Sequence, residues 1–395
     1  MPLCTFSPFF CFLAPNIETP VAEIILKEVL TKKQLREFIY LPSKIHKNEQ
    51  NWLPPIYADE WLLFNKKKNR SYQYADAVFF LAYKNNRPAG RIMGLVNNRY
   101  NSIKNEKHGR FCFMDCYNDQ EVVHALLTKV EEWVLGKGMI KIVGPLGFSD
   151  KDPQGLQIEG FEYPYLFTAA TNSPYLPALM EPEGYTKEVD LVNYSIPMPD
   201  QLPLIYLKAH ERFARRMEFE VIQFSSKKEI KPYIIPVLEL MNQTFSDIYG
   251  FVPLNDKEKE EFANRYLQIV DPEFIKVVRS ANELVGFAVA IPDLSPGIIA
   301  AKGKLFPFGL FKILKAIKKS KKMMLMLGGI RKDYRGQGID VLMAFKMLDS
   351  AKKREMRLID SHLILEKNTR MRAECERLDG KIVKRFRIYQ KQLKT

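Results

Sequence analysis

The sequence predicts a mixed α/β fold, of the α+β kind, in which two halves of similar architecture follow each other. The chain has 395 residues, which is enough for two domains. Its composition, 46% hydrophobic and 27% charged, provides ample apolar material for buried cores. Strand-like and helix-like segments recur in nearly the same order in both halves, which indicates a tandem duplication. We therefore expect domains at 1–200 and 201–395, divided in the proline-containing stretch 196–216.

The first half contains strand and helix signals in a regular order. A strand over 21–29 precedes a helix that Pro42 interrupts, and a hairpin over 76–98 turns at 85–88. The next segments are listed here by their expected structure: a strand (109–117), a helix capped by Asn118 or Asp119 (120–138) and a short buried strand (139–145). Two loops rich in glycine, proline and tyrosine follow, and such loops often carry ligand sites.

The second half repeats this order of elements. It comprises a strand (218–224), two helices (231–250 and 256–270), a hairpin turning at Ala281–Asn282 (274–293), a strand (323–330), a helix (339–354), a strand (356–366), a short helix (368–380) and a final strand (381–393). Each half is thus expected to form a mixed, mostly antiparallel sheet flanked by helices.

The positive charge of the chain is concentrated at its end. The net charge is +14, but residues 301–395 carry 26 Lys and Arg against 9 Asp and Glu, so this part alone has a charge of +17. Phosphate-bearing ligands, anionic lipid or nucleic acid all fit such a surface.

Cysteine usage and hydropathy restrict the class of protein further. The five cysteines are scattered, and Cys112 and Cys116 lack a matching second pair, so we expect neither a disulfide framework nor a metal site. No apolar run is long enough to span a bilayer. The apolar segment 1–15 lacks a basic start, which favours a loose or strand-like tail over a secretion signal. These features predict a cytoplasmic location.

A glycine turn between a strand and a helix is the clearest candidate site. In "RKDYRGQGID", Gly336 and Gly338 precede the helix, whose free N–H groups and dipole favour an anion. Arg331, Lys332 and Arg335 add positive charge. The spacing matches neither a Walker A loop nor a full dinucleotide fingerprint. Phosphate binding and a tight turn without a ligand both remain open on spacing alone.

This turn resembles the acyl-CoA signature of the GNAT superfamily of N-acyltransferases, Arg/Gln-x-x-Gly-x-Gly/Ala. Arg335 and Gly338 match the pattern, and Asn368, in "LEKNTRMRAECERLDG", stands at the asparagine that follows in the superfamily. The resemblance covers residues 217–395 well and the first half by architecture only. Segments such as "WLPPI" and "GPLGFS" are similar to bacterial tandem-GNAT proteins, a match that implies a fold but no particular reaction.

The resemblance implies an acyl-CoA donor, acetyl-CoA or a longer acyl-CoA, and an unidentified amine acceptor. It places the pyrophosphate on the backbone from Arg335 to Asp340. The implied donor-binding residues are Ile330, Arg331, Lys332, Arg335, Gly336, Gln337, Gly338, Ile339, Asp340 and Asn368.

The sequence departs from the superfamily pattern in its acidic and catalytic residues. Asp340 stands where the pattern has Gly or Ala, so its carboxylate either turns away from the ligand or repels it. Cys375 stands where many relatives have a tyrosine as general acid, and the glycine strand carries no glutamate base. His362, Glu366 and Tyr389 are alternative proton carriers, and all four residues also have structural interpretations. His362 and Glu366, four positions apart along a strand, would lie on one face.

The lysine-rich segment 308–322 predicts an amphipathic helix with four apolar residues on one face: Leu310, Phe311, Leu314 and Ile317. It can pack this face on the sheet, lie on an anionic membrane, cover the acyl donor or contact an acidic carrier protein. Nucleic acid is disfavoured, because no aromatic platform accompanies the charge.

The first half lacks a glycine turn, and Asp119 would repel a phosphate there. We therefore expect this half to form the acceptor side of a cleft. The sequence predicts an acyltransferase that moves an acyl group from acyl-CoA to an amine. The alternative is a non-catalytic GNAT-like protein that binds anionic membrane or a partner through the 308–322 helix.

Overall fold

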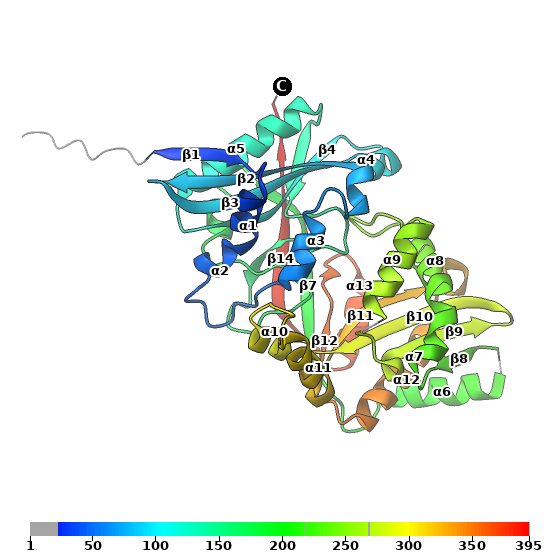
Figure 1. Ribbon diagram of the computed structural model, residues 1–395. Helices are drawn as coiled ribbons and strands as arrows, with labels where there is room; N and C mark the ends of the chain where they lie inside the picture. Colours follow the sequence, from blue (N-terminus) through cyan, green and yellow to red (C-terminus); the bar gives the residue numbers. More distant parts are fainter. Residues whose placement is uncertain (1–22, 217, 268, 395) are drawn as a thin grey trace, which may run out of the picture.

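The computed structural model describes residues 23–216, 218–267 and 269–394 of the chain. The tail expected over residues 1–15 lies outside the described residues. Hydrogen-bonded strands from both halves form one continuous sheet, and helices cover its two faces (Figure 1). The predicted mixed α/β fold is therefore confirmed.

The first half follows the predicted order of elements closely. Its strands are β1 (Ile24–Glu28), β2 (Ala75–Lys84), β3 (Arg87–Asn97), β4 (His108–Cys116), β5 (Lys141–Gly144), β6 (Leu156–Glu159) and β7 (Thr186–Pro197). Its helices are α1 (Lys32–Tyr40), α2 (Pro42–Ile45), α3 (Tyr57–Leu63), α4 (Asn98–Lys104) and α5 (Gln120–Gly136). The β2–β3 hairpin turns at Asn85 and Asn86, both with positive φ, as a two-residue turn requires.

The second half also matches the predicted order. Its strands are β8 (Glu220–Gln223), β9 (Ile275–Ser280), β10 (Glu283–Pro292), β11 (Lys322–Ile330), β12 (Leu358–Ser361), β13 (Ile364–Leu365) and β14 (Lys381–Gln392). Its helices are α6 (Leu204–Arg216), α7 (Lys227–Ile230), α8 (Ile234–Thr244), α9 (Asp256–Tyr266), α10 (Ser295–Ala301), α11 (Gly309–Lys319), α12 (Ile339–Lys353) and α13 (Thr369–Arg377).

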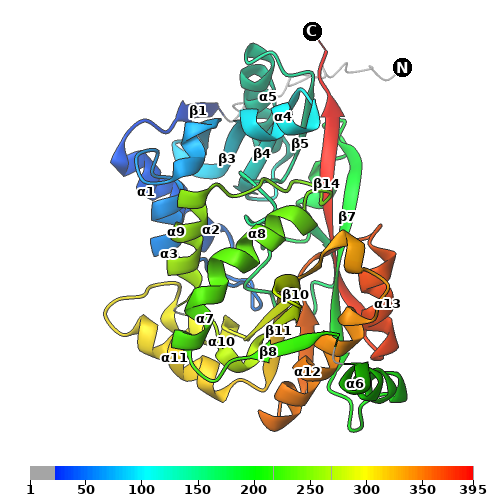
Figure 2. The same cartoon turned by 90° about the vertical axis from the view of Figure 1, so that its right-hand side faces the viewer.

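The two halves exchange their long last strands. The order of strands in the sheet is β1-β2-β3-β4-β5-β14-β7-β12-β11-β10-β9-β8. Strand β14, from the end of the chain, pairs with β5 in the first half, whereas β7 pairs with β12 in the second half. The two strands also pair with each other and run side by side between the halves (Figures 1 and 2). A boundary near residue 200 therefore separates the halves in sequence but does not interrupt the sheet.

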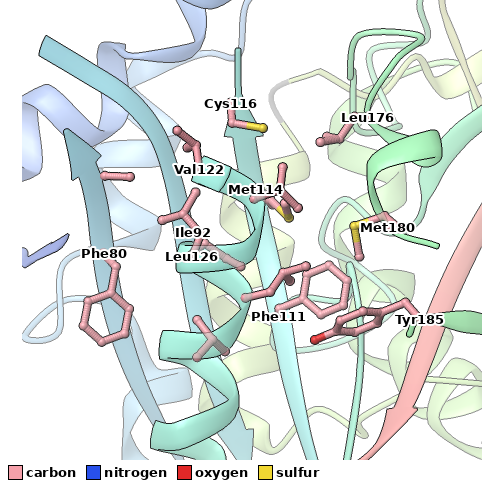
Figure 3. Close-up of a cluster of buried hydrophobic side chains, with 14 of the residues drawn as sticks. Phe80, Ile92, Phe111, Met114, Cys116, Val122, Leu126, Leu176, Met180 and Tyr185 are labelled. Carbon is pink, nitrogen blue, oxygen red and sulfur yellow. The ribbon is translucent and has the colours of Figure 1, made fainter. Parts of the chain in front are cut away.

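Helices α5 and α12 each cover the sheet of their own half. Apolar residues of α5, among them Val122 and Leu126, contact Phe80, Ile92 and Phe111 of neighbouring strands in a fully buried core (Figure 3). In the second half, α12 packs on β9 and against α6. Both helices follow a central strand directly, so the start of each helix lies at the end of that strand.

The structure differs from the sequence predictions in several features. Strand β7 was not predicted, because charged and polar residues interrupt its apolar pattern, but two of them are buried and hydrogen bonded: Asp190 with Arg387, and Asn193 with the carbonyl of Ser361. The strand predicted over 356–366 breaks after Ser361, where the chain stops pairing with β11 and continues along β7 as β13. Helix α10 was not predicted.

A further difference concerns the lysine-rich helix. The sequence left several partners open for its apolar face, and in the structure α11 packs chiefly on α10 rather than on the sheet. Ile313 is buried in that contact, whereas Leu310, Phe311 and Leu314 are 44%, 70% and 39% exposed.

Candidate functional site

The turn between β11 and α12 exposes a row of unoccupied backbone donors. Gly336 and Gly338 have φ angles of 78° and 88°, a region that side chains beyond glycine rarely adopt. Gly338 is the N-cap of α12, and no side chain caps this helix. Among the described residues, no hydrogen bond engages the N–H groups of residues 336–340. The turn can therefore receive an anion at the positive end of the helix dipole.

The basic residues around this turn differ in their availability. Arg331 is held by Glu283 at 2.7 Å and by Asp333 at 2.8 Å, and Lys332 is paired with Asp247 at 2.8 Å. Arg335 donates instead to the backbone carbonyl of Ile330, at 3.1 Å. Of the three predicted cations, Arg335 is thus the one whose charge no carboxylate of the described residues neutralises through an ion pair.

The carboxylate of Asp340 and the side chain of Gln337 complete the turn. Asp340 is exposed in the first turn of α12, and none of the hydrogen bonds of the described residues involves its carboxylate. Gln337 donates to the carbonyl of Asp333 at 3.0 Å, which ties the turn to the preceding 3-10 segment. Ile339 is buried under the turn and fixes the start of the helix.

Strand β11, which leads into this turn, parts from β12 before the turn is reached. Their parallel pairing extends only from Lys322 to Leu325, and the last link is the N–H of His362 donating to the carbonyl of Leu325 at 2.9 Å. Met326 is an extra residue opposite β10, a bulge that turns both Met326 and Leu327 to the face covered by α8 and α10. Beyond Leu325, β11 remains only partly buried.

The four predicted proton carriers lie in different environments. His362 lies at the point where the strands part, and burial lowers the pKa of its imidazole below the ordinary value. Glu366 is paired with Lys187 at 2.7 Å rather than with His362. Cys375 is buried in the core beneath α12, where burial raises the pKa of its thiol to about 12. Tyr389 lies in the core of the first half, where burial raises its pKa to about 12.

The structure therefore places His362 beside β11, the strand that leads into the glycine turn, but it ties Glu366 to Lys187 and leaves Cys375 and Tyr389 in the cores. Asn368 starts α13, and its side-chain oxygen accepts a hydrogen bond from the N–H of Met371 at 3.2 Å. This exposed asparagine thus has a capping role already.

Comparisons with known proteins identify the fold. No protein-family model matches the chain. A tandem GNAT protein from the clavulanic acid biosynthesis pathway superposes on 94% of this chain and 99% of its own, with a TM-score of 0.54 at 10% identity. A GCN5-related N-acetyltransferase from Sphaerobacter thermophilus covers 94% of this chain and 96% of its own, with a TM-score of 0.51 at 13% identity. The chain has a tandem GNAT fold.

Two curated proteins are similar to this GNAT-fold chain over nearly its whole length. A bacterial ceramide synthase of Caulobacter vibrioides is 26% identical over 382 residues, which are 94% of this chain and 98% of that protein. The protein YghO of Escherichia coli is 26% identical over 380 residues, 93% of this chain and 95% of that protein. The resemblance inferred from the glycine turn is confirmed at the level of the fold.

The first GNAT half contains a buried ionic cluster that the sequence analysis missed. His46 contacts Asp115 of β4 at 2.9 Å, and its other ring nitrogen lies 3.2 Å from the hydroxyl of Ser173 and 3.1 Å from Glu49. Arg91 of β3 donates to Asp115 at 2.8 Å. Apart from His46 and Glu49, which are three positions apart, these residues come from separate elements, so no local motif could reveal the cluster.

The electrostatics of this ionic cluster keep His46 charged. Burial alone would lower the pKa of His46, but hydrogen bonds to Asp115 and Glu49 outweigh it and raise the pKa to about 9. Burial raises the pKa of Glu60, which faces Arg91, to about 7. Asp115 is also buried, but Arg91 and His46 hold its pKa below the ordinary value. A protonated imidazole cannot act as a base, so the cluster is better suited to closing this half than to proton transfer.

A groove of about 590 Å³ lies next to this ionic cluster, between the first half and residues 295–319. These residues comprise α10, α11 and the loop between them, and we call them the α10–α11 connection. Trp52, which stacks on His46 with ring centroids 5.7 Å apart, forms part of its wall. The lining residues are Arg36, Tyr40, Ser43, Trp52, Pro54, Tyr57, Ile299, Lys302 and Lys304. The groove therefore combines aromatic walls with three basic side chains and no carboxylate.

No group of side chains among the described residues could hold a metal ion. Within the same ranges, no helix has both the length and the apolar character needed to cross a bilayer.

Proposed function

We propose that this protein transfers an acyl group from acyl-CoA to an amine, and that its second half binds the donor. The observation that carries this proposal is the open N-terminus of α12, where residues 336–340 present free N–H groups just after β11, the strand from which β12 parts at Leu325. A diphosphate fits such donors, and Arg335 can add a neutralising charge.

The thioester would lie along β11, next to the bulge at Met326. At a bulge, one residue has no partner on the neighbouring strand, and here that residue is Met326. A backbone N–H near it can therefore polarise the thioester carbonyl. The amine nitrogen forms the new bond to the acyl carbon, the carbon–sulfur bond breaks, and the thiolate of CoA leaves. The fold contributes mainly by positioning the two reactants.

His362 is the side chain best placed to accept the proton of the amine. Its lowered pKa keeps the imidazole neutral near pH 7, and a neutral imidazole can act as a base. Glu366 is less suited, because its carboxylate is engaged by Lys187. Cys375, with a pKa of about 12, stays a thiol in the core.

The acceptor class is supported by the relative named bacterial ceramide synthase, which is 26% identical over 94% of this chain. Ceramides are amides of long-chain amino alcohols, so we propose a long-chain amino alcohol as acceptor and a long-chain acyl-CoA as donor. The aromatic groove beside α10 offers apolar surface for such a molecule.

The test is amide formation from defined substrates. The purified chain is incubated with palmitoyl-CoA or acetyl-CoA and with a long-chain amino alcohol, and the amide is measured by mass spectrometry together with thiol release. We expect the palmitoyl amide with one equivalent of CoA thiol. Neither product, together with no calorimetric binding of either donor at millimolar concentration, would falsify the enzyme proposal.

A His362→Gln variant tests the base. We expect kcat to fall at least 30-fold with an unchanged dissociation constant for acyl-CoA, and the acidic limb of the rate profile to disappear. Glu366→Gln is the matched control on the same segment, and it should change kcat less than threefold. Equal losses in both variants would contradict the role of His362.

A further inference from the structure

The α10–α11 connection presents the largest group of exposed apolar side chains in the described part of the chain. Of the fifteen large apolar residues that are exposed there, six lie within positions 299–314. We call them the apolar patch: Ile299 (54% exposed), Phe306 (83%), Phe308 (68%), Leu310 (44%), Phe311 (70%) and Leu314 (39%). Soluble surfaces rarely gather apolar side chains in this way without a partner.

The apolar patch is held on a packed support. Ile313 of α11 is buried against α10, and a Cβ at Gly297 would lie 2.6 Å from the Cα of Ile313, so the two helices approach closely. The N–H of Tyr57 donates to the carbonyl of Gly303 at 3.0 Å, which joins the connection to the first half. The patch therefore faces outward because the opposite side of the helix pair is already buried.

Positive charge surrounds the apolar patch. Residues 301–322 contain eight lysines and no carboxylate. Six of these lysines are exposed and form no ion pair with the described residues: Lys302, Lys304, Lys312, Lys315, Lys318 and Lys319. Apolar side chains framed by lysines are typical of segments that lie in the headgroup region of an anionic membrane.

We infer that the α10–α11 connection docks this protein on an anionic lipid surface, with the aromatic residues entering the leaflet and the lysines contacting headgroups. Ile299, Lys302 and Lys304 belong both to this surface and to the aromatic groove. Docking thus places the mouth of the groove at the level of the headgroups, where an amphiphilic acceptor can leave the bilayer. This role of the groove rests on the proposed function, whereas docking itself does not.

The test is cosedimentation of the full chain with vesicles, without substrate. We compare vesicles of phosphatidylcholine with vesicles containing 30% phosphatidylglycerol. The wild-type chain should bind the anionic vesicles at least tenfold more tightly than the neutral ones, and 0.5 M salt should weaken that binding. The same affinity for both vesicles, or no binding to either, would overturn the inference.

Matched variants locate the contact. Replacing Phe306, Phe308 and Phe311 by Ser should reduce binding to anionic vesicles at least tenfold. The control replaces two exposed apolar residues elsewhere, Leu30 and Ile140, by Ser, and it should bind as the wild type does. If the control loses as much affinity as the test variant, the patch is not the contact.

A second pair of variants tests the contribution of the lysines to vesicle binding. Lys315, Lys318 and Lys319 are changed to Gln, and the control changes Lys66, Lys67 and Lys68, an exposed trio near α3. Only the α11 variant should lose affinity, by fivefold or more. Equal behaviour of the two trios would contradict docking through α11.

Two further measurements separate docking from its alternatives and from the proposed reaction. If the wild-type chain self-associates and Phe306→Ser disperses it, the patch is a contact between copies and not a lipid surface. Acyl transfer to a short water-soluble amine should be the same in the phenylalanine variant and the wild type. If the wild type forms an amide from neither the short amine nor the long-chain amino alcohol, the reaction is refuted while docking is left intact.

Discussion

Strands β4 and β11 hold corresponding positions in the two halves, and the space beside each is filled differently. Each pairs in parallel with the next strand at its first residues only, β4 with β5 and β11 with β12. Each also carries a bulge against its antiparallel neighbour. β4 is buried along nearly its whole length, with Asp115 bound to Arg91 and His46, whereas the second part of β11 is only partly buried.

The helices that follow these strands differ in the same sense. Asp119 caps α5 by accepting a hydrogen bond from the N–H of Val122 at 3.3 Å, and it also binds Lys84. Gly338 starts α12 without any side-chain cap. The same scaffold is therefore closed by side chains in one half and open to an anion in the other.

Removing the carboxylate of Asp115 should have the largest effect. Asp115→Ala leaves Arg91 and His46 buried without their counter-charge, which costs about 3–5 kcal/mol when a buried ion pair loses one partner. Urea unfolding measures this loss. The control is Asp256→Ala, because the side chain of Asp256 is 94% exposed although it is paired with Lys259. That variant should lose less than about 1 kcal/mol, and acyl-CoA affinity of folded Asp115→Ala should be unchanged.

The glycine N-cap of α12 should carry the next largest effect. Gly338→Val puts a branched side chain at a φ of 88° beside the free N–H groups, so we expect at least a 100-fold loss of acyl-CoA affinity by calorimetry. Gly138, at a φ of 76° after α5, is the matched control in the first half. Gly138→Val should suffer similar backbone strain but retain affinity. Retained affinity in Gly338→Val would show that this turn is not the donor site.

The two halves were not equally accessible from the sequence. The glycine turn and α12 are formed by consecutive residues, so the local sequence pattern was enough to predict them. The ionic cluster joins His46, Asp115 and Arg91 across separate elements, and only the β3–β4 pairing brings two of them together. The exchange of β7 and β14 is equally nonlocal, since β14 starts almost 200 residues after β7 begins. Local sequence patterns therefore predicted the glycine turn of the second half but not the ionic cluster of the first half.

Protonation of His46 should make the stability of the protein depend on pH. Its pKa is raised from 6.5 to about 9, so its contribution is complete below pH 6.5 and is lost as the pH rises toward 9. Glu60, with its pKa raised from 4.5 to about 7, makes stability fall as the pH rises, mainly below pH 7. Lys276 and Lys384, with pKa values lowered from 10.5 to about 8, make stability rise with pH, and their effect grows as the pH approaches and passes 8. The informative window is therefore pH 7 to 8.

Within that window, His46 alone should make the free energy of unfolding fall by about 1 kcal/mol per pH unit, since its imidazole releases about one proton on unfolding, and the two lysines offset part of this fall. The slope of His46→Gln should therefore be more positive than that of the wild type by about 1 kcal/mol per pH unit. His124→Gln, in which an exposed histidine is replaced, leaves the ionic cluster intact and should keep the wild-type slope. A wild-type slope in His46→Gln would mean that another group titrates.

Replacing Asp340 should have the smallest effect, and it tests how far a carboxylate at the glycine turn weakens acyl-CoA binding. The carboxylate is exposed, so its repulsion of a diphosphate acts through solvent and amounts to about 1 kcal/mol or less. Asp340→Asn should therefore tighten acyl-CoA binding by no more than about fivefold at low salt and by less at 0.5 M salt. Asp349→Asn, farther along α12, should leave affinity unchanged. A gain of 50-fold or more would instead place the carboxylate against the bound diphosphate. In that case the acid would close the second half as Asp119 closes the first.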